Sequence, residues 1–334
     1  MTETPPGDSQ AIDRARAAAE PHPEAQAVLD ALEAMDAPSF ADLTPEQARE
    51  TMAAMFDRES DIAVARVEDR RIDGPAGEIP IRIHDPEPDR ADGSRPAICY
   101  FHGGGWVVGS IDAADATCRK LATETGYPVV SVGYRLAPEH PFPAGLEDCY
   151  AALEWAADGV DDLGGDPDRL VLAGDSAGGT LATATSLLSA RRDGPSVVYQ
   201  VLFYPATGDA TGTDSYEAFG DGYLLSTEES AWFRDHYFER EIDEANVFAA
   251  PRLASDRLLS ALPPATIVTA GFDPLRDDGA AYADRLADAG VPVTYRNYPD
   301  MIHGFAGMLE PPVELEVAHE AHADVVTDLH DALE

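Results

Sequence analysis

The fold of this chain is decided by a strand–turn–helix segment that reads LVLAGDSAGGTLA from Leu170 to Ala182. Its first four residues are apolar and predict a buried strand, while the small residues from Ala177 onward predict a helix packed closely against that strand. Between them, residues 174–178 fit the pattern G-x-S-x-G, in which a sharp turn presents Ser176 as a nucleophile. The pattern alone is common in Gly-rich sequences, but its place between a strand and a helix favours a catalytic serine.

A second glycine-rich segment, HGGGW at residues 102–106, follows an apolar run at 97–101 that predicts a strand. Acyl transfer places negative charge on the former carbonyl oxygen, and backbone N–H groups must reach that oxygen without side chains in the way. Three consecutive glycines allow this approach, and the N-terminus of the helix after Ser176 directs further N–H groups to the same region. The alternatives are a tight glycine turn at a strand end and a dinucleotide loop. The next glycine after Gly105 is Gly109, which does not fit the dinucleotide pattern G-x-G-x-x-G.

A serine nucleophile needs a base and an acid that orients the base, and later loops supply both in the chain order Ser, Asp, His. Asp273 follows an apolar, strand-like run at 266–269, and His303 follows a similar run at 293–298. Carboxyl ends of parallel strands meet at one edge of a sheet. Both side chains are therefore expected at the edge that carries Ser176.

The rest of the chain alternates between strand-like and helix-like segments. Further apolar runs lie at 129–134 and 197–203, and helical patterns lie at 112–125, 144–157, 176–191, 275–289 and 313–333. Short apolar strands separated by helices predict a mostly parallel sheet that is covered on both faces. Before them, residues 64–72 and 78–84 alternate in hydropathy around a Gly-Pro-Ala-Gly turn and predict an antiparallel hairpin.

Two segments depart from this alternation and predict a cap over the carboxyl edge of the sheet. One is N-terminal, with helical spacing at 23–35 and a second helix from Thr44, where Pro45 and Gln47 complete a capping-box pattern. The other is an insertion rich in Gly, Asp and aromatic residues, with a helix-like stretch at 227–238. We therefore expect a helical cap segment at 1–62, a core at 63–206, a cap insertion at 207–246 and a continued core at 247–334.

The charge balance excludes several classes of function. The chain has 334 residues, with 62 Asp and Glu against 23 Lys and Arg, a formal net charge of −39. Such a surface repels nucleic-acid phosphates and anionic lipids. Lys120 is the only lysine and follows an arginine, so no P-loop is present. The acid excess resembles that of proteins from halophilic microbes with molar salt in the cytoplasm. Molar salt screens the repulsion between acidic side chains, so such a chain can fold there.

The remaining features predict a soluble, cytoplasmic protein. Cys99, Cys118 and Cys149 form no even framework and no CxxC pair, as expected in a reducing compartment. The start, MTETPPGDSQ, lacks the basic and apolar regions of a signal peptide. No apolar run approaches the ~18 residues that a membrane span requires.

No metal site is expected. His319 and His322 fall one residue short of the zinc motif H-E-x-x-H, and we expect both to be solvated on a polar helix. The acidic cluster at 158–168 lacks the spacing of a calcium loop. His102 is expected to order the glycine loop through hydrogen bonds rather than to titrate in catalysis.

Aromatic side chains are the candidates for the walls of a substrate pocket. Those of the insertion are Tyr216, Phe219, Tyr223, Trp232, Phe233, Tyr237 and Phe238, of which half or more are expected only to hold the cap together. The predicted pocket combines Phe219 and Tyr223 with three aromatic residues from outside the insertion. These are Trp106, Tyr204 and Phe305.

Taken together, the motifs resemble those of the hormone-sensitive lipase family of α/β-hydrolases, the group IV microbial esterases. The matching segments are YFHGGGW at 100–106, YRLAPE at 134–139, GDSAGG at 174–179, DPLRD at 273–277 and IHGF at 302–305. The resemblance extends from about residue 60 to 310. It implies an α/β-hydrolase fold, with a mostly parallel eight-stranded sheet, helices on both faces and a helical cap.

Residue by residue, the resemblance makes Ser176 the nucleophile, His303 the base and Asp273 its orienting acid. The amides of Gly104, Gly105 and Ala177 would form the oxyanion hole, with Gly103 taking part if the loop is shifted by one residue. The implied activity is two-step hydrolysis of short- to medium-chain acyl esters, without a metal or organic cofactor. Thr180 stands where asparagine is frequent in the family, and the first 60 or so residues match only in being helical.

Two other functions remain open at this point. An amidase or N-deacetylase would use the same triad, and a non-catalytic ligand receptor would share the fold. The gibberellin receptors, which resemble this family, have lost the catalytic histidine, whereas His303 stands in an intact IHGF segment. The expected partner is a small ester, and a homodimer is compatible with the sequence.

Overall fold

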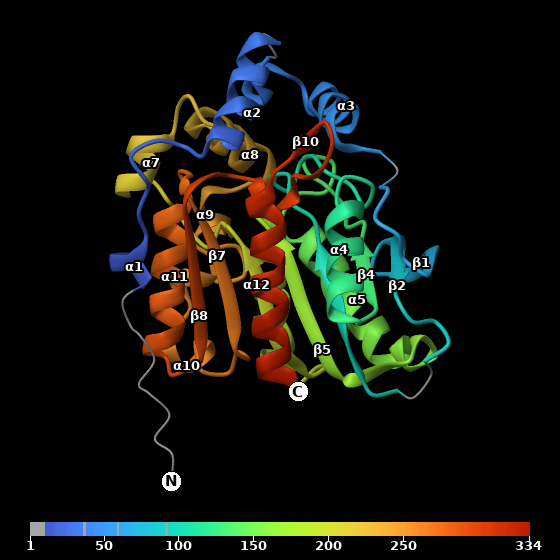
Figure 1. Ribbon diagram of the computed structural model, residues 1–334. Coiled ribbons are helices and arrows are strands. Elements are labelled where there is room, and N and C mark those ends of the chain that lie inside the picture. The colour runs from blue at the N-terminus through green and yellow to red at the C-terminus, as the bar shows by residue number, and fades with distance from the viewer. Residues whose placement is uncertain (1–10, 36–37, 59, 91–92) are drawn as a thin grey trace.

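The computed structural model describes residues 11–35, 38–58, 60–90 and 93–334 (Figure 1). The prediction that the chain begins without a signal peptide concerns residues 1–10, which lie outside the described residues. Within them, eight strands form one sheet in the order β1-β2-β4-β3-β5-β6-β7-β8. The strands are β1 Arg66–Gly74, β2 Gly77–Asp85, β3 Arg95–Phe101, β4 Val129–Val132, β5 Gly165–Asp175, β6 Val197–Phe203, β7 Ala265–Phe272 and β8 Val293–Ile302.

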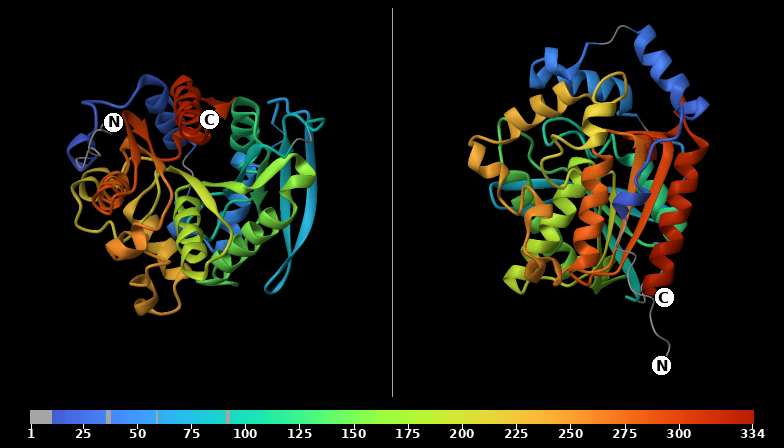
Figure 2. Two further views of the ribbon diagram at one scale, coloured as in Figure 1. Left: turned by 90° about the horizontal axis from the view of Figure 1, so that it is seen from below. Right: turned by 90° about the vertical axis from the view of Figure 1, so that its left-hand side faces the viewer.

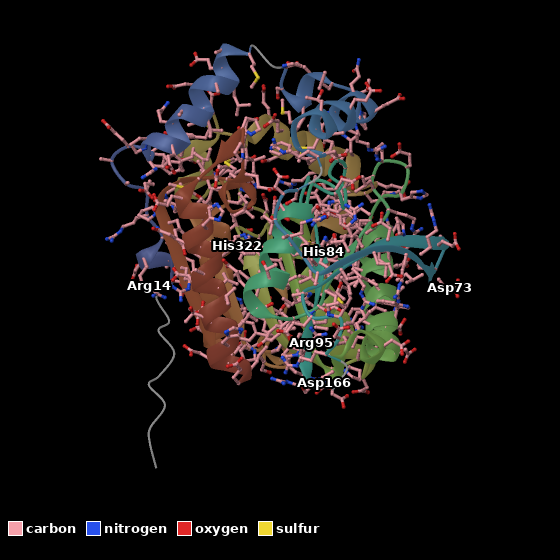
Figure 3. The ribbon with its side chains drawn as sticks, turned by 45° about the vertical axis from the view of Figure 1, so that its right-hand side comes forward. Arg14, Asp73, His84, Arg95, Asp166 and His322 are labelled. Carbon is pink, nitrogen blue, oxygen red and sulfur yellow. The ribbon has the colours of Figure 1, made fainter. Side chains whose placement is uncertain are left out.

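The sheet is parallel from β4 to β8 and antiparallel at its β1 end. The β1–β2 hairpin closes with Gly74 opposite Gly77, and β2 pairs antiparallel with β4. The predicted mostly parallel sheet and its N-terminal hairpin are confirmed. Arg95 at the start of β3 (Figure 3) is buried, and its guanidinium donates hydrogen bonds to the Asp85 carboxylate and the Leu163 carbonyl.

Helices cover both faces of the sheet (Figure 2). On β5, Leu170 and Leu172 enter one apolar core, and Val171 and Ala173 enter the other, because successive strand residues point to opposite faces. The first core contains buried residues of α5 Ala144–Gly159, α6 Ala177–Arg192 and α11 Arg276–Asp288. The second contains those of α4 Asp115–Thr125 and α12 Glu316–Leu333.

Helices from the N-terminal segment and the insertion lie together above the carboxyl edge of the sheet (Figure 1). They are α2 Pro23–Ala34, α3 Pro45–Phe56, α7 Asp214–Phe219 and α8 Thr227–Tyr237. Thr44 and Gln47 form the predicted capping box of α3. Glu229 on α8 joins the two segments, since its Oε1 accepts hydrogen bonds from Ser39 Oγ (3.2 Å) and the Phe40 amide (3.1 Å). The four-part division of the chain stays a prediction.

The remaining short elements connect or edge these layers. They are α1 Ala11–Arg14, α9 Glu241–Glu244, α10 Asp256–Leu259, β9 Leu309–Glu310 and β10 Val313–Glu314, with 3₁₀ turns at Phe40–Asp42, Val160–Leu163, Pro251–Leu253 and Phe305–Gly307. The helix predicted at 313–333 begins later, at Glu316, because residues 313–314 pair with β9 instead. No helix within the described part of the chain has the length and apolar character to cross a bilayer.

Candidate active site

The turn between β5 and α6 holds Ser176 in a backbone conformation that few residues adopt, with φ 52° and ψ −120°. Such strain persists only where the surroundings fix it. A Cβ on Gly178 would lie 1.9 Å from the Phe101 carbonyl oxygen, and one on Gly174 would lie 2.4 Å from backbone atoms of Gly178. Only glycine therefore lets the strand and the helix approach closely enough to form this turn.

Three predicted site residues follow three different strands directly and meet at one sheet edge. Ser176 follows β5, Asp273 follows β7 and His303 follows β8. His303 Nε2 lies 3.0 Å from Ser176 Oγ, and His303 Nδ1 lies 2.8 Å from Asp273 Oδ2. The buried Asp273 carboxylate fixes the tautomer with hydrogen on Nδ1, which leaves Nε2 free to accept the serine proton.

The Asp273 side chain is itself held in place. Its Oδ1 accepts a hydrogen bond from the Leu275 amide at 2.8 Å, and the side chain has no exposed surface. The ring of Tyr204 also packs against the imidazole of His303, with 4.8 Å between ring centroids. The base is thus restrained by both a carboxylate and an aromatic ring.

The glycine loop approaches Ser176 with unusual backbone angles, φ 111° at Gly104, 57° at Gly105 and 63° at Trp106. Gly104, Gly105 and Ala177, the three predicted oxyanion donors, all line the cavities beside Ser176. The Gly103 amide instead donates to Asp175 Oδ1 at 2.9 Å. This bond engages the Gly103 N–H in positioning the loop, which favours the unshifted set of donors.

His102 orders the loop through hydrogen bonds, as predicted. Its Nδ1 lies 2.8 Å from the Gly103 oxygen, and its ring stacks on Tyr134, whose hydroxyl donates to the His102 carbonyl at 2.7 Å. Burial lowers the pKa of His102 to about 4. The imidazole therefore stays neutral at neutral pH and acts as a rigid part of the loop.

Asp175, the variable residue of the G-x-S-x-G pattern, has a positioning role that the sequence analysis missed. Its Oδ1 accepts hydrogen bonds from the Gly103 amide and from Tyr100 Oη (2.7 Å). Burial raises the pKa of the Asp175 carboxyl. The carboxylate thus ties the glycine loop to the serine turn, and its location inside the motif was the available signal.

Replacing Asp175 by alanine should free the glycine loop and lower kcat for ester hydrolysis by about 10²-fold, comparable to the loss of one oxyanion donor. KM should change little, because the donors act mainly on the transition state. Asp175→Asn keeps an acceptor oxygen and should restore most of kcat. Tyr100→Phe removes only the hydrogen bond from Tyr100 and leaves the one from the Gly103 amide. Equal kcat in wild type and Asp175→Ala would contradict this role.

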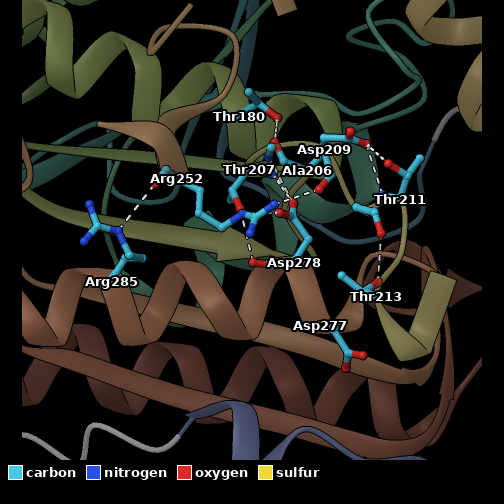
Figure 4. A network of polar contacts seen from close by, with 12 residues as sticks. Thr180, Ala206, Thr207, Asp209, Thr211, Thr213, Arg252, Asp277, Asp278 and Arg285 are labelled. Carbon is cyan, nitrogen blue, oxygen red and sulfur yellow. Dashed lines mark hydrogen bonds and ion pairs between the residues drawn. The ribbon is translucent and has the colours of Figure 1, made fainter. Parts of the chain in front are cut away.

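The loop after β6, which carries Ala206 and Thr207 (Figure 4), forms the other wall beside Ser176. The Ala206 amide donates to the Ser176 carbonyl at 3.4 Å, and Thr180 Oγ1 donates to the Ala206 carbonyl. Buried Asp278 accepts hydrogen bonds from the Thr207 amide (2.5 Å) and the Gly208 amide (3.1 Å). The hydroxyl of Thr180 therefore supports this wall.

Asp278 also forms an ion pair that the sequence did not reveal. Its Oδ1 lies 2.8 Å from Arg252 Nε (Figure 4). Burial raises the pKa of the Asp278 carboxyl, while the Arg252 charge opposes that rise. The pair thus helps to fix the loop at 207–208, whose amides donate to Asp278.

Two cavities meet at Ser176. The smaller has a volume of about 80 Å³, and its lining includes Trp106, Ala206, Gly208, Tyr216 and Arg234. The larger has a volume of about 450 Å³, and its lining includes His303, Tyr204, Leu32, Met52 and Met55. Gly105, Ser176, Leu225 and Phe233 line both cavities.

Three of the five predicted pocket aromatics do not line either cavity, which corrects that prediction. Phe305 is fully buried and packs on Tyr204, 5.9 Å between ring centroids. Phe219 and Tyr223 pack on Phe272 at 5.3 and 5.2 Å. Their rings fill the space between the insertion and the sheet edge. Trp106 lies in the smaller cavity and Tyr204 in the larger.

The expectation that His322 is solvated is wrong. It falls on the buried stripe of α12, and its Nε2 lies 3.0 Å from the Ala306 carbonyl (Figure 3). Burial lowers the pKa of His322 to about 4. His319 is near Glu314 at 3.3 Å, and the described residues contain no group of three or more ligand side chains suited to a metal.

Buried His102 and His322 should make the fold sensitive to acid. The unfolded chain binds their protons at the ordinary pKa of 6.5, whereas the folded chain resists protonation down to about 4. Stability is therefore lost as the pH falls from about 6.5 to 4. The urea midpoint in molar KCl should decrease over this range, and less in His322→Gln, which can still donate to Ala306. An identical decrease in both proteins would contradict the role of His322.

Comparison with known proteins identifies the family. A family model described as the alpha/beta hydrolase fold matches residues 98–307. Esterase LipI of Mycobacterium tuberculosis is 44% identical over 244 residues, 72% of this chain and 75% of that protein. Carboxylesterase NlhH of the same organism is 39% identical over 269 residues, 79% of this chain and 83% of that protein.

The similarity extends to solved structures. The crystal structure of a thermostable esterase from Pseudomonas putida has a TM-score of 0.89 and 33% identity, covering 95% of this chain and 99% of that one. A hyperthermophilic esterase from Pyrobaculum calidifontis has a TM-score of 0.83 and 38% identity, covering 93% and 98%. The chain therefore belongs to the α/β-hydrolase family and, within it, to the group IV esterases that resemble hormone-sensitive lipase.

Proposed function

We propose that this chain is a serine carboxylesterase that hydrolyses short- to medium-chain acyl esters through an acyl-enzyme. The observation that carries the proposal is the position of His303, within hydrogen-bond distance of both Ser176 and Asp273. A strained serine turn beside a glycine loop supplies the remaining requirements of acyl transfer. The names of the similar proteins, esterase and carboxylesterase, support the same reaction class.

In the proposed first step, His303 Nε2 takes the Ser176 proton while Oγ attacks the ester carbonyl carbon. The carbonyl oxygen becomes an oxyanion that receives hydrogen bonds from the amides of Gly104, Gly105 and Ala177. His303 then gives the proton to the alcohol oxygen, and the carbon–oxygen bond breaks. Water repeats the sequence on the acyl-enzyme, so that the carboxylic acid leaves and the proton returns to Ser176.

The direct test is covalent capture of the serine. A p-nitrophenyl alkylphosphonate should release one equivalent of p-nitrophenol and leave the phosphonyl group on the peptide that contains Ser176. Parallel assays with p-nitrophenyl butyrate and its anilide distinguish an esterase from an amidase. Faster cleavage of the anilide would favour the amidase, and binding without labelling or turnover would favour a receptor.

The proposal includes adaptation to high salt, because the folded protein crowds acidic groups around few cations. Arg82 lies 2.6 Å from an Asp69 oxygen and 2.8 Å from an Asp112 oxygen, and Arg296 pairs with both Asp324 and Asp328. One arginine thus serves two carboxylates, and the many acidic groups in excess repel one another unless salt screens them.

Dilution from molar to millimolar KCl should lower the thermal midpoint by tens of degrees. Each kcal/mol of repulsion lowers the midpoint by about 5 °C in a small domain and by less in one of this size. Sucrose at equal osmolality is the control, since it does not screen charge. A midpoint independent of KCl would contradict salt adaptation and leave the esterase proposal intact.

A further inference from the structure

We infer that the smaller cavity holds the acyl group and the larger cavity holds the alcohol, so that the preferred substrates are short-acyl esters of large apolar alcohols. The inference rests on the proposed esterase function and deepens it. Three observations support it. They are the position of His303 in the larger cavity, the volumes of the two cavities and the elements that form their walls.

The position of His303 fixes the direction of the substrate. The tetrahedral carbon on Ser176 carries the oxyanion, the alcohol oxygen and the acyl chain. The oxyanion must face the glycine loop, and the alcohol oxygen must face His303 Nε2, because that nitrogen protonates it. Among the described residues, His303 lines the larger cavity and not the smaller one. The acyl chain is left with the smaller cavity, where Ala177 and Gly105 flank Ser176.

The smaller cavity limits the acyl chain by its volume. Its 80 Å³ is less than a fifth of the 450 Å³ of the larger cavity, and we place its limit at short acyl groups, acetyl through butyryl. Tyr216 and Arg234 stand in its wall, and Arg234 is anchored by ion pairs to Asp209 (3.1 Å) and Glu244. A longer acyl chain would have to displace these side chains.

The wall of the smaller cavity toward the sheet is also fixed. Ala206 and Gly208 line it, and the Asp278 carboxylate holds the Thr207 and Gly208 amides (Figure 4). Asp278 in turn pairs with Arg252. Because this support is buried in the core, the acyl cavity cannot widen without breaking a network of charged and backbone groups.

The larger cavity has walls of a different kind. The side chains of Leu32, Met35, Met52 and Met55 come from the cap helices or their ends, and methionine adapts to ligands of different shape. Its volume of 450 Å³ falls within the range of small-molecule sites. This cavity suits a flexible or bulky apolar alcohol.

The charged groups of the larger cavity disfavour an anionic alcohol. Its described lining contains Asp175 and Glu229 but no Lys or Arg. The Glu229 carboxylate already accepts hydrogen bonds from Ser39, from the Phe40 amide and from Ser226. It therefore has little capacity left to select a polar group, and apolar contact dominates.

Two substrate series test the assignment in molar KCl. The first varies the acid, with p-nitrophenyl esters from acetate to octanoate. The second varies the alcohol, with acetates from methanol to 1-octanol, followed by acid release. We expect kcat/KM to fall by about 10²-fold or more between butyrate and octanoate, and to rise along the acetate series by about 10-fold, as buried apolar area increases. Faster hydrolysis of octanoate than of butyrate, together with a fall in kcat/KM along the acetate series, would overturn the assignment. This result requires only the wild-type protein.

Two matched variants sharpen the test. Tyr216→Ala, in the smaller cavity, should raise kcat/KM for octanoate relative to acetate by about 10-fold and leave the order of alcohols unchanged. Met52→Ala, in the larger cavity, should weaken the preference for octyl acetate and leave the acyl limit unchanged. If Tyr216→Ala changed the order of alcohols and Met52→Ala changed the acyl limit, the inference would be overturned while the esterase proposal would stand. If no ester is hydrolysed in a Ser176-dependent manner, the proposed function itself fails.

Discussion

Ser176→Ala should lower kcat/KM for p-nitrophenyl butyrate by about 10⁵- to 10⁶-fold, since loss of a triad nucleophile leaves only binding and the oxyanion donors. Ser176 Oγ lies 3.0 Å from His303 Nε2. Removal of that oxygen leaves no atom at this position to attack the ester. Alanine adds no bulk, so the strained turn and both cavities should be retained. Initial rates at saturating and limiting ester, in molar KCl, give the two kinetic constants.

The control for this variant is a serine on the helix that follows Ser176. Ser189 on α6 donates a hydrogen bond to the Pro195 carbonyl at 2.7 Å, away from His303. Ser189→Ala should keep kcat within a few-fold while losing about 1 kcal/mol of stability from that bond. If Ser176→Ala, with an unchanged circular dichroism spectrum, keeps more than about 1% of wild-type activity, Ser176 is not the nucleophile.

The sequence predicted those parts of the fold in which local pattern and burial agree. The run at 170–173 forms a strand because its residues are apolar on both faces. The chain turns at Ser176 because Gly174 and Gly178 lie on either side of it. The capping box at Thr44 identified the start of α3 for the same reason, since the required contacts are local. The placement of Asp273 and His303 followed from the parallel sheet, which brings strand ends to one edge.

What the sequence could not predict depends on packing between distant segments. Phe219 and Tyr223 are aromatic residues of the insertion, but only the folded chain shows them against Phe272 rather than in a cavity. The polar neighbours of His322 predict a solvated side chain, but α12 buries a stripe of residues that includes Ala321, His322 and Val325. Phe233, which lines both cavities, packs against Phe40 of the N-terminal segment with 6.1 Å between ring centroids, a contact that no local pattern predicts.

Asp273→Asn should lower kcat by about 10⁴-fold, with KM almost unchanged, because it changes the tautomer of the base and not the substrate cavities. The carboxylate accepts the His303 Nδ1 proton at 2.8 Å and the Leu275 amide proton at 2.8 Å. With its oxygen kept by the Leu275 amide, the asparagine NH₂ would face Nδ1 and donate to it. The ring hydrogen would then lie on Nε2, where the serine proton must be accepted.

The tautomer explanation can be separated from simple loss of packing. Asp277→Asn is the matched control, since that carboxylate accepts a hydrogen bond from the Ser215 amide at 2.8 Å and pairs with Arg276 at the start of α11. It should lower stability while kcat stays within about 10-fold. Nitrogen NMR of the imidazole should place hydrogen on Nδ1 in wild type and on Nε2 in Asp273→Asn. The same tautomer in both proteins, or similar losses of kcat in both variants, would show that Asp273 supports the loop and does not orient His303.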